Sequence, residues 1–178
     1  HGFDIGTGAD LVVNAVAVQP DGRIVVVGDF AHFNGVALPG IARLNPDGSL
    51  DGSFNPGTGF NDSVRLVGVQ EDGRILVGGF FTEFNGAVRN RVARLMPDGS
   101  LDGTFDVGEG ANGSVYSLAV QSDGKILVGG SFSTFNNLNR SGIVRLNPDG
   151  SVDTGINFGT GANGSVLDIA VRPDYKIL

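Results

Sequence analysis

Short runs of Val, Ile, Leu and Phe alternate along the chain with clusters of Gly, Pro, Asn and Asp, a pattern typical of β-strands separated by turns. Between residues 63 and 113, four such runs predict strands over Val64–Gln70, Arg74–Phe81, Arg91–Met96 and Ser100–Phe105. No segment combines a 3.6-residue apolar period with capping residues, so we expect almost no helix. The sequence therefore predicts an all-β domain.

This pattern of runs and turns repeats with a period of 51 residues. The stretch that begins at Ser63 aligns residue by residue with the stretch that begins at Ser114. A fixed period of this length indicates a solenoid, a propeller or an array of one structural unit. We therefore expect a single repeat domain over residues 1–178. Its units fall at approximately 12–62, 63–113 and 114–164, followed by a partial unit at 165–178.

Two kinds of connection join the strands of each unit. Tight Asp-Gly turns such as Asp72–Gly73 and Asp98–Gly99 follow the first and third strands, whereas longer connections span residues 82–90 and 106–113. Strands joined in this order make an antiparallel meander, which buries its faces by stacking against neighbouring meanders. The sequence predicts a β-propeller, or an arc of one, with about 3.5 repeats of four-stranded antiparallel blades. Both long connections should emerge on the face opposite the tight turns.

The number of units also bears on assembly. Because propellers usually close with about four to eight blades, we expect the chain to be part of a larger ring. The alternative is that copies of the chain associate through the incomplete unit.

Within a blade, we expect the first strand, with Val64, Val67 and Val69, to be buried on both faces near the axis. The third strand, with Arg94, should lie farther out.

Several segments of the second and third units match the sequence of a known repeat. They read Ile-Leu-Val-Gly-Gly, Phe, Phe-Asn-Gly, Ala-Arg-Leu, Pro-Asp-Gly-Ser-Leu-Asp and Gly-Thr-Gly-Ala-Asn-Gly-Ser-Val (Ile75–Gly79, Phe81, Phe84–Gly86, Ala93–Leu95, Pro97–Asp102 and Gly159–Val166). These segments resemble the delta-60 repeat, a bacterial propeller-forming repeat whose function is mostly unassigned. The resemblance covers nearly the whole chain. It implies a blade in a large secreted or cell-surface bacterial protein, often beside adhesive modules, and it brings no catalytic residues.

Composition narrows the choice of partners. The formal net charge is −7 and the pI is near 4.6, whereas nucleic-acid binding needs a clustered basic surface. No apolar run approaches the roughly 20 residues that span a bilayer. The absence of cysteine excludes disulfides, thiolate metal sites and a cysteine nucleophile. We therefore expect neither nucleic-acid binding nor membrane insertion.

Repeated carboxylates are the first candidates for chemistry. Asp98 and Asp102 recur in every unit and could bind calcium, although the alternating acidic ligands of an EF-hand loop are absent. The alternative is structural, with Asp98 forming the turn and Asp102 pairing with Arg94. The acids that do not repeat show no pairing for glycoside hydrolysis, and His32 occupies the position of Glu83. We therefore expect no catalytic residue, metal site or cofactor.

Binding remains, and loops held by a rigid scaffold are its usual place. Residues that differ between equivalent positions of the units are not required by the fold. Arg65 and Tyr116 share one such position and belong to residue types enriched in interface hot spots. The recurring Phe-Asn-Gly (Phe84–Gly86) is instead expected to pack its Phe under the loop and to cap the loop with its Asn. The candidate ligand-binding residues are His32, Arg65, Glu83, Arg89, Arg91 and Tyr116.

Together these features favour a non-enzymatic structural or interaction module that presents its long-loop face to a protein or glycan partner. Two alternatives stay open. The first is an architectural subunit of an extracellular filament or oligomer, joined through open blade edges. The second is a propeller enzyme that acts on a carbohydrate.

Overall fold

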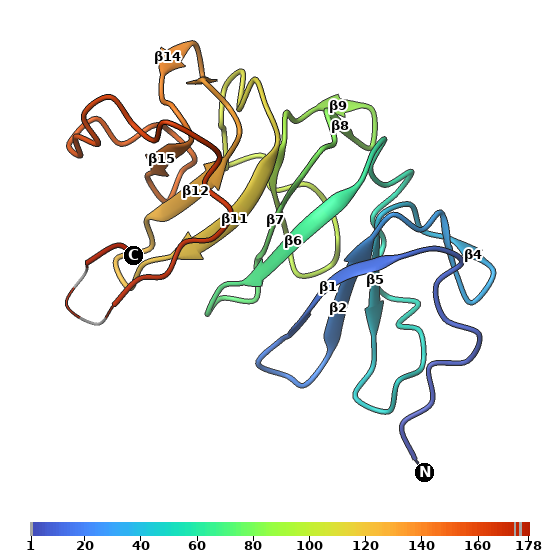
Figure 1. Cartoon of the computed structure of the whole chain (residues 1–178). Coiled ribbons are helices and arrows are strands. Elements are labelled where there is room, and N and C mark those ends of the chain that lie inside the picture. The colour runs from blue at the N-terminus through green and yellow to red at the C-terminus, as the bar shows by residue number, and fades with distance from the viewer. Residues whose placement is uncertain (1, 173, 175) are drawn as a thin grey trace.

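The computed structural model describes residues 2–172, 174 and 176–178, and these residues form an all-β arc. Three antiparallel sheets follow one another along the chain and lie side by side, one sheet per unit (Figure 1). In the partial unit, Ala170 and Leu178 exchange backbone hydrogen bonds of 3.1 and 2.9 Å. No helix long and apolar enough to cross a membrane occurs among the described residues.

Each unit builds a three-stranded sheet in which the second strand is central. The sheets comprise β1 (Val13–Val18), β2 (Ile24–Gly28) and β5 (Ile41–Leu44); β6 (Val64–Val69), β7 (Ile75–Gly79) and β10 (Val92–Leu95); and β11 (Val115–Val120), β12 (Ile126–Gly130) and β15 (Ile143–Leu146). A small hairpin lies in the loop between the second and third strands. These hairpins are β3 (His32–Phe33) with β4 (Val36–Ala37), β8 (Glu83–Phe84) with β9 (Ala87–Val88), and β13 (Thr134–Phe135) with β14 (Leu138–Asn139).

The Phe-Asn-Gly segments form the tips of these small hairpins. Asn85 and Gly86 have φ angles of 49° and 75°, both positive, as a two-residue type I′ loop requires. Phe84 is buried beneath the loop. The Oδ1 atom of Asn85 accepts a 3.1 Å hydrogen bond from the backbone N–H of Thr58 in the preceding connection. The predicted packing of the Phe and capping by the Asn are both confirmed.

The fourth strand is much shorter than predicted. In place of a strand over residues 100–105, a single antiparallel bridge joins Leu95 to Leu101. The chain then turns, because the Asp102 carboxylate accepts hydrogen bonds from the N–H (2.9 Å) and hydroxyl (2.6 Å) of Thr104. Beyond the turn, the N–H of Asp106 donates to the carbonyl of Asp149 in the next unit at 2.8 Å. The ends of the first and second blades, at Asn55 and Asp106, therefore bind the next blade and leave their own sheets.

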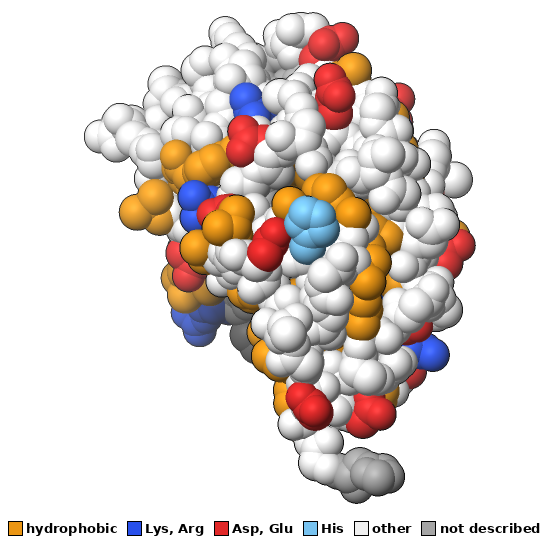
Figure 2. Space-filling model, turned by 90° about the vertical axis from the view of Figure 1, so that its right-hand side faces the viewer, with side chains coloured by type: hydrophobic (Ala, Val, Ile, Leu, Met, Phe, Trp, Pro, Cys, Tyr) orange, Lys and Arg blue, Asp and Glu red, His pale blue; other side chains and the backbone are white. Residues whose placement is uncertain are grey.

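The second strand, and not the first, is the most buried one. Within β7, Ile75 and Val77 face the core shared with the first sheet, and Leu76 faces the core shared with the third. The first strand is less buried than predicted, because Val64 is buried but Val67 and Val69 are only partly buried. Val16 and Val18 of β1 are 60% and 66% exposed. Figure 2 shows exposed hydrophobic side chains on this side of the molecule.

A buried arginine on the third strand ties each of the first two blades to the next. The Nε of Arg94 lies 2.7 Å from Asp102 Oδ2, which confirms the predicted ion pair. Its Nη1 donates to the carbonyl of Pro148 in the third unit at 2.7 Å, and its guanidinium stacks 4.5 Å from the ring centre of Phe105. Arg43 makes the same contacts one unit earlier, with Asp51 and Pro97. We call this arrangement the arginine latch.

The repeated turn carboxylates are also occupied within the chain. Asp98 Oδ1 accepts hydrogen bonds from the N–H and hydroxyl of Ser100 at 2.9 and 2.6 Å. Among the described residues, no three acidic or histidine side chains are grouped so that they could hold a metal ion. The structural role of the repeated Asp residues is therefore sufficient to explain their recurrence.

Candidate functional site

A β-bulge at the start of each first strand directs one side chain out of the regular register. Pairing between the first and second strands is interrupted between Val13 and Ala15, between Val64 and Leu66, and between Val115 and Ser117. The residues left unpaired are Asn14, Arg65 and Tyr116. Bulges re-aim side chains in this way at many binding sites. All three lie at the long-loop end of their strands, opposite the Asp-Gly turns.

Hydrogen bonds join the first two of these bulge residues across the blade boundary. Asn14 Nδ2 donates to Asp29 Oδ1 at 2.7 Å, and Arg65 Nη1 donates to Asn14 Oδ1 at 3.2 Å. The hydroxyl of Ser63 donates to the same oxygen of Asp29. The amide of Asn14 therefore links a carboxylate of the first blade to a guanidinium of the second.

Aromatic contacts extend this cluster to the third blade. The Cζ of Arg65 lies 4.7 Å from the ring centre of Phe80, a cation–π geometry. Phe80 in turn meets Tyr116 edge to face, with ring centres 6.1 Å apart. The hydroxyl of Ser131 lies 3.4 Å from that of Tyr116. We refer to Asn14, Asp29, Arg65, Phe80 and Tyr116 as the bulge cluster.

The polar environment sets the protonation of this cluster. The hydrogen bond from Ser63, aided by that from Asn14 and by the nearby charge of Arg65, lowers the pKa of Asp29 and outweighs the opposing effect of burial. Hydrogen bonds with Ser131 and Ser114, and then the charge of Arg65, lower the pKa of Tyr116. Asp29 is therefore a carboxylate at neutral pH and acts as a hydrogen-bond acceptor.

A cavity of about 440 Å³ opens beside the cluster, between the first and second blades. Its polar lining comes from Asp29, Asn61, Asp62, Ser63 and Arg65. Its apolar lining comes from Phe30, Pro39, Phe60 and Phe80. A concave site that combines apolar walls with a few converging polar groups is typical of ligand pockets.

The six candidate residues predicted from the sequence do not form one site. Arg65 and Tyr116 are brought together through Phe80. His32 and Glu83 lie on the small hairpins of different blades, where His32 Nδ1 pairs with Asp10 at 2.9 Å.

The last two candidates belong to the loop after β9. Arg89 Nη1 donates to the carbonyl of Val88 at 2.6 Å, and Arg91 Nη1 donates to that of Phe81 at 3.4 Å. Neither bonds to the bulge cluster among the described residues. Asn14 and Asp29 complete the cluster but were not among the predicted residues, because only the bulge brings them together.

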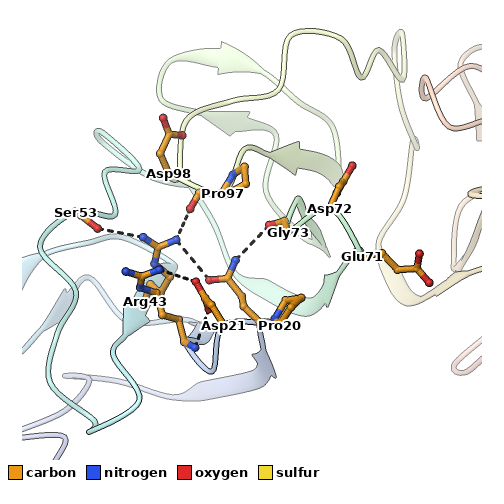
Figure 3. A pocket seen from close by; sticks show the side chains of 11 residues that line it. Pro20, Asp21, Arg43, Ser53, Glu71, Asp72, Gly73, Pro97 and Asp98 are labelled. Atoms are coloured by element: carbon orange, nitrogen blue, oxygen red, sulfur yellow. Dashed lines mark hydrogen bonds and ion pairs between the residues drawn. The ribbon is translucent and has the colours of Figure 1, made fainter.

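A second cavity, of about 540 Å³, lies on the opposite face between the same blades (Figure 3). Its central side chain is Arg43, whose guanidinium is engaged by the carbonyl of Pro97 and the hydroxyl of Ser53. Gln19 spans the gap and donates to the carbonyl of Gly73 at 3.2 Å. These polar groups already hold the blades together, so this cavity is the weaker candidate for a ligand site.

The sequence was also compared with protein families. The family described as a domain of unknown function (DUF5122) beta-propeller matches residues 19–54, 70–105 and 121–155, more than half of the chain. The chain belongs to this β-propeller family. Each DUF5122 match begins at the first tight turn and covers the second and third strands. The bulge residues Asn14, Arg65 and Tyr116 lie outside all three matches.

Solved structures share this fold at low sequence identity. The extracellular domain of a B. thetaiotaomicron protein described as a one component system, BT4673, matches 98% of the chain with a TM-score of 0.57 and 17% identity. The match covers 21% of that protein, so the chain spans about a fifth of its length.

PorZ, a bacterial surface component of the type-IX secretion system of Porphyromonas gingivalis, matches 94% of the chain and 25% of its own length, with 15% identity and a TM-score of 0.47. The extracellular domain of a B. thetaiotaomicron protein described as a hybrid two component system, BT3049, matches 96% of the chain and 25% of its own length, with 13% identity and a TM-score of 0.45. A search of curated proteins found no match.

Proposed function

We propose that this propeller domain is a non-enzymatic interaction module that binds a protein or glycan partner through its long-loop face. One observation carries the proposal. Three blades with nearly the same backbone place different side chains, Asn14, Arg65 and Tyr116, at one bulge position, and these side chains join into a cluster beside a cavity. A repeated scaffold with varied chemistry at one exposed position is an arrangement suited to recognition.

We further propose that the parent protein is bacterial and is secreted or displayed at the cell surface. The resemblance to the delta-60 repeat supports this location, and we propose that the 51-residue unit is a member of that repeat. The similar structures named above are described as extracellular domains and a bacterial surface component. The absence of cysteine and the net charge of −7 agree with such a location but do not require it.

The protonation state of Asp29 favours a role in binding over a role as the general acid of glycoside hydrolysis. A glycosidase needs a carboxylic acid whose pKa is raised so that it can protonate the leaving group. In Asp29 the hydrogen bonds from Ser63 and Asn14 lower the pKa. Asp29 is therefore unsuited to the role of that general acid, and we propose that it serves in recognition.

The proposal can be tested with glycan and protein arrays probed with the 178-residue chain. The double variant R65A/Y116A should lose at least tenfold in affinity, because truncation of a hot-spot residue typically costs about 2 kcal/mol or more. The matched control is R172A, which removes a 54% exposed arginine outside the cluster and should bind like wild type. Equal binding by wild type and the double variant would contradict the proposal.

An architectural role is the second candidate, and the exposed β1 strand favours it. Val16 and Val18 are 60% and 66% exposed, whereas the equivalent Val67 and Val69 are partly covered by the preceding blade. A further blade from another copy could cover them. This role predicts a mass that rises with concentration in light scattering and a V16D/V18D variant that stays monomeric. A wild-type chain that is monomeric at all concentrations would exclude it.

A further inference from the structure

Two hydrogen-bonding groups of the bulge cluster have no partner among the described residues. Asp29 Oδ1 takes the bonds from Asn14 and Ser63, which leaves Oδ2 without one. Arg65 uses Nη1 to bond Asn14, which leaves Nη2 without one. The carboxylate and the guanidinium do not form an ion pair with each other, because Asn14 stands between them. The cavity is thus lined by an acceptor of Asp29 and a donor of Arg65 that are both held in place, with the carboxylate of Asp62 beside them.

This pair of groups discriminates between kinds of ligand. An anionic ligand would be attracted by Arg65 but repelled by Asp29 and by Asp62, which also lines the cavity. An ammonium group would be attracted by the two carboxylates but would have to lie beside the Arg65 guanidinium at the same wall. Two neighbouring hydroxyls satisfy both groups, because each hydroxyl can donate one hydrogen bond and accept another. One hydroxyl would donate to Asp29, and the next would accept from Arg65.

The aromatic residues of the cluster suit the apolar C–H face of a sugar ring. Phe80 lines the same cavity and is fixed between the Arg65 guanidinium and the ring of Tyr116. Both rings are partly exposed. The C–H groups of a sugar ring form an apolar surface that can pack against such rings, while its hydroxyls remain at the polar wall. The polar subsite spans the first and second blades, through Asp29 and Arg65, and the aromatic subsite spans the second and third, through Phe80 and Tyr116.

We propose that the cleft between the first and second blades binds a neutral sugar residue of a glycan through two vicinal hydroxyls, one donating to Asp29 and one accepting from Arg65. The next residue of the glycan lies toward Tyr116. This inference rests on the proposed function of the long-loop face and narrows its partner from a protein or glycan to a neutral glycan.

The experiment is affinity electrophoresis of the whole chain in native gels. The gels contain one of three neutral polysaccharides, galactomannan, xylan or mixed-linkage β-glucan, or the anionic polygalacturonate. We expect retardation by at least one neutral polymer and none by polygalacturonate. D29N and R65M preserve the size of each side chain and should each weaken the interaction roughly tenfold, since each removes a hydrogen bond to a charged group. R172A is the control, and each polymer should retard it, relative to its own mobility in a polymer-free gel, by the same factor as wild type.

The outcomes separate this inference from the proposed function. Retardation by polygalacturonate alone, or binding to a protein that R65A/Y116A abolishes, would leave the long-loop face as a binding site but overturn the neutral-glycan assignment. Retardation by a neutral polymer that D29N and R65M leave unchanged would also overturn it, as would no retardation by any of the three. Thermal unfolding of each variant shows whether it folds. If D29N does not fold, the result is decided by comparing R65M with R172A, with urea added so that the two variants have the same stability.

Discussion

Arg91 occupies a backbone conformation that its equivalents fill with glycine. Its φ angle is 70°, and the matching positions of the other units are Gly40 at 77° and Gly142 at 71°. A residue with a Cβ is strained in this left-handed region, at a cost of roughly 1–2 kcal/mol. The side chain regains little, because its hydrogen bond to the carbonyl of Phe81 is 3.4 Å long. Arg91 is thus a local exception within a repeated structure.

Replacing Arg91 with glycine should therefore stabilise the chain. Relief of the strain exceeds the entropy that glycine adds to the unfolded state, so R91G should raise the free energy of unfolding by up to about 1 kcal/mol. R89G is the control, because the φ of Arg89 is not positive, and it should lower stability. Urea denaturation measures both, and a loss of stability in R91G equal to that in R89G would contradict this account.

Asp153 makes the stability of the folded chain depend on pH. Hydrogen bonding from Lys125, then from the N–H of Gly155 and from Arg145, lowers its pKa to about 2. Because the folded pKa lies below the unfolded value, the stabilisation is complete above the unfolded pKa and is lost as the pH falls toward 2. Wild type should lose stability steadily between about pH 5 and pH 2, whereas D153N should be less stable at pH 7 and show a shallower slope. Denaturation curves at several pH values test this, and parallel slopes would contradict it.

Among the elements, the bulge of the first strand depends on a glycine in the second. A Cβ at Gly79 would collide with the carbonyl oxygen of Ser63, just before the bulge residue Arg65. Gly28 and Gly130 meet the carbonyls of Val12 and Ser114 in the same way. The three glycines thus allow the backbone of the first strand to approach closely where the bulge forms.

The variant G79A should consequently disturb both the fold and the site. We expect a loss of about 1–3 kcal/mol of stability from the forced backbone shift, together with weaker ligand binding through the displaced Arg65. G68A is the matched control, because a Cβ at Gly68 meets no atom within 4 Å. A G79A variant as stable as G68A would show that the bulge does not need this glycine.

The elements could be predicted from the sequence where local chemistry decides them. The Asp-Gly turns follow from residues that favour positive φ, and the period of 51 residues implied the stacked blades, whereas the small hairpin tipped by Asn85 and Gly86 was not predicted within the connection 82–90. The fourth strand was predicted too long, because its apolar residues carry no sign that Asp102 turns the chain. The bulge was not predicted, since it is a property of the pairing with the second strand. Of the five residues of the bulge cluster, which depends on it, only Arg65 and Tyr116 were therefore predicted as candidate site residues.

At the scale of the whole molecule, the arginine latch couples the blades. R94A would leave the buried Asp102 with Arg74, whose Nε lies 3.2 Å from Oδ2, as its remaining cationic partner, so the loss should be roughly 3 kcal/mol, the low end for a broken buried pair. R145A should cost less, because Arg145 is 17% exposed and bonds to no carbonyl of a following blade among the described residues. R94M/D102N removes both charges but keeps an amide oxygen to accept the hydrogen bonds from Thr104, so it should recover part of the loss. Chemical denaturation tests this order, and an equal loss in R94A and R145A would contradict it.

The latch on one face of the propeller serves stability, and we propose that the bulge cluster on the other face serves recognition. The tight-turn face holds the latch, and the long-loop face holds the cluster and its cavity of about 440 Å³. This division is the central claim, and an NMR titration of the ¹⁵N-labelled chain with a neutral hexasaccharide, prepared from the polymer that retards it most, tests it most directly. The account predicts amide shifts concentrated at Asn14, Asp29, Arg65 and Tyr116. Shifts concentrated at the tight turns around Asp21 and Asp72, or at neither face, would contradict it.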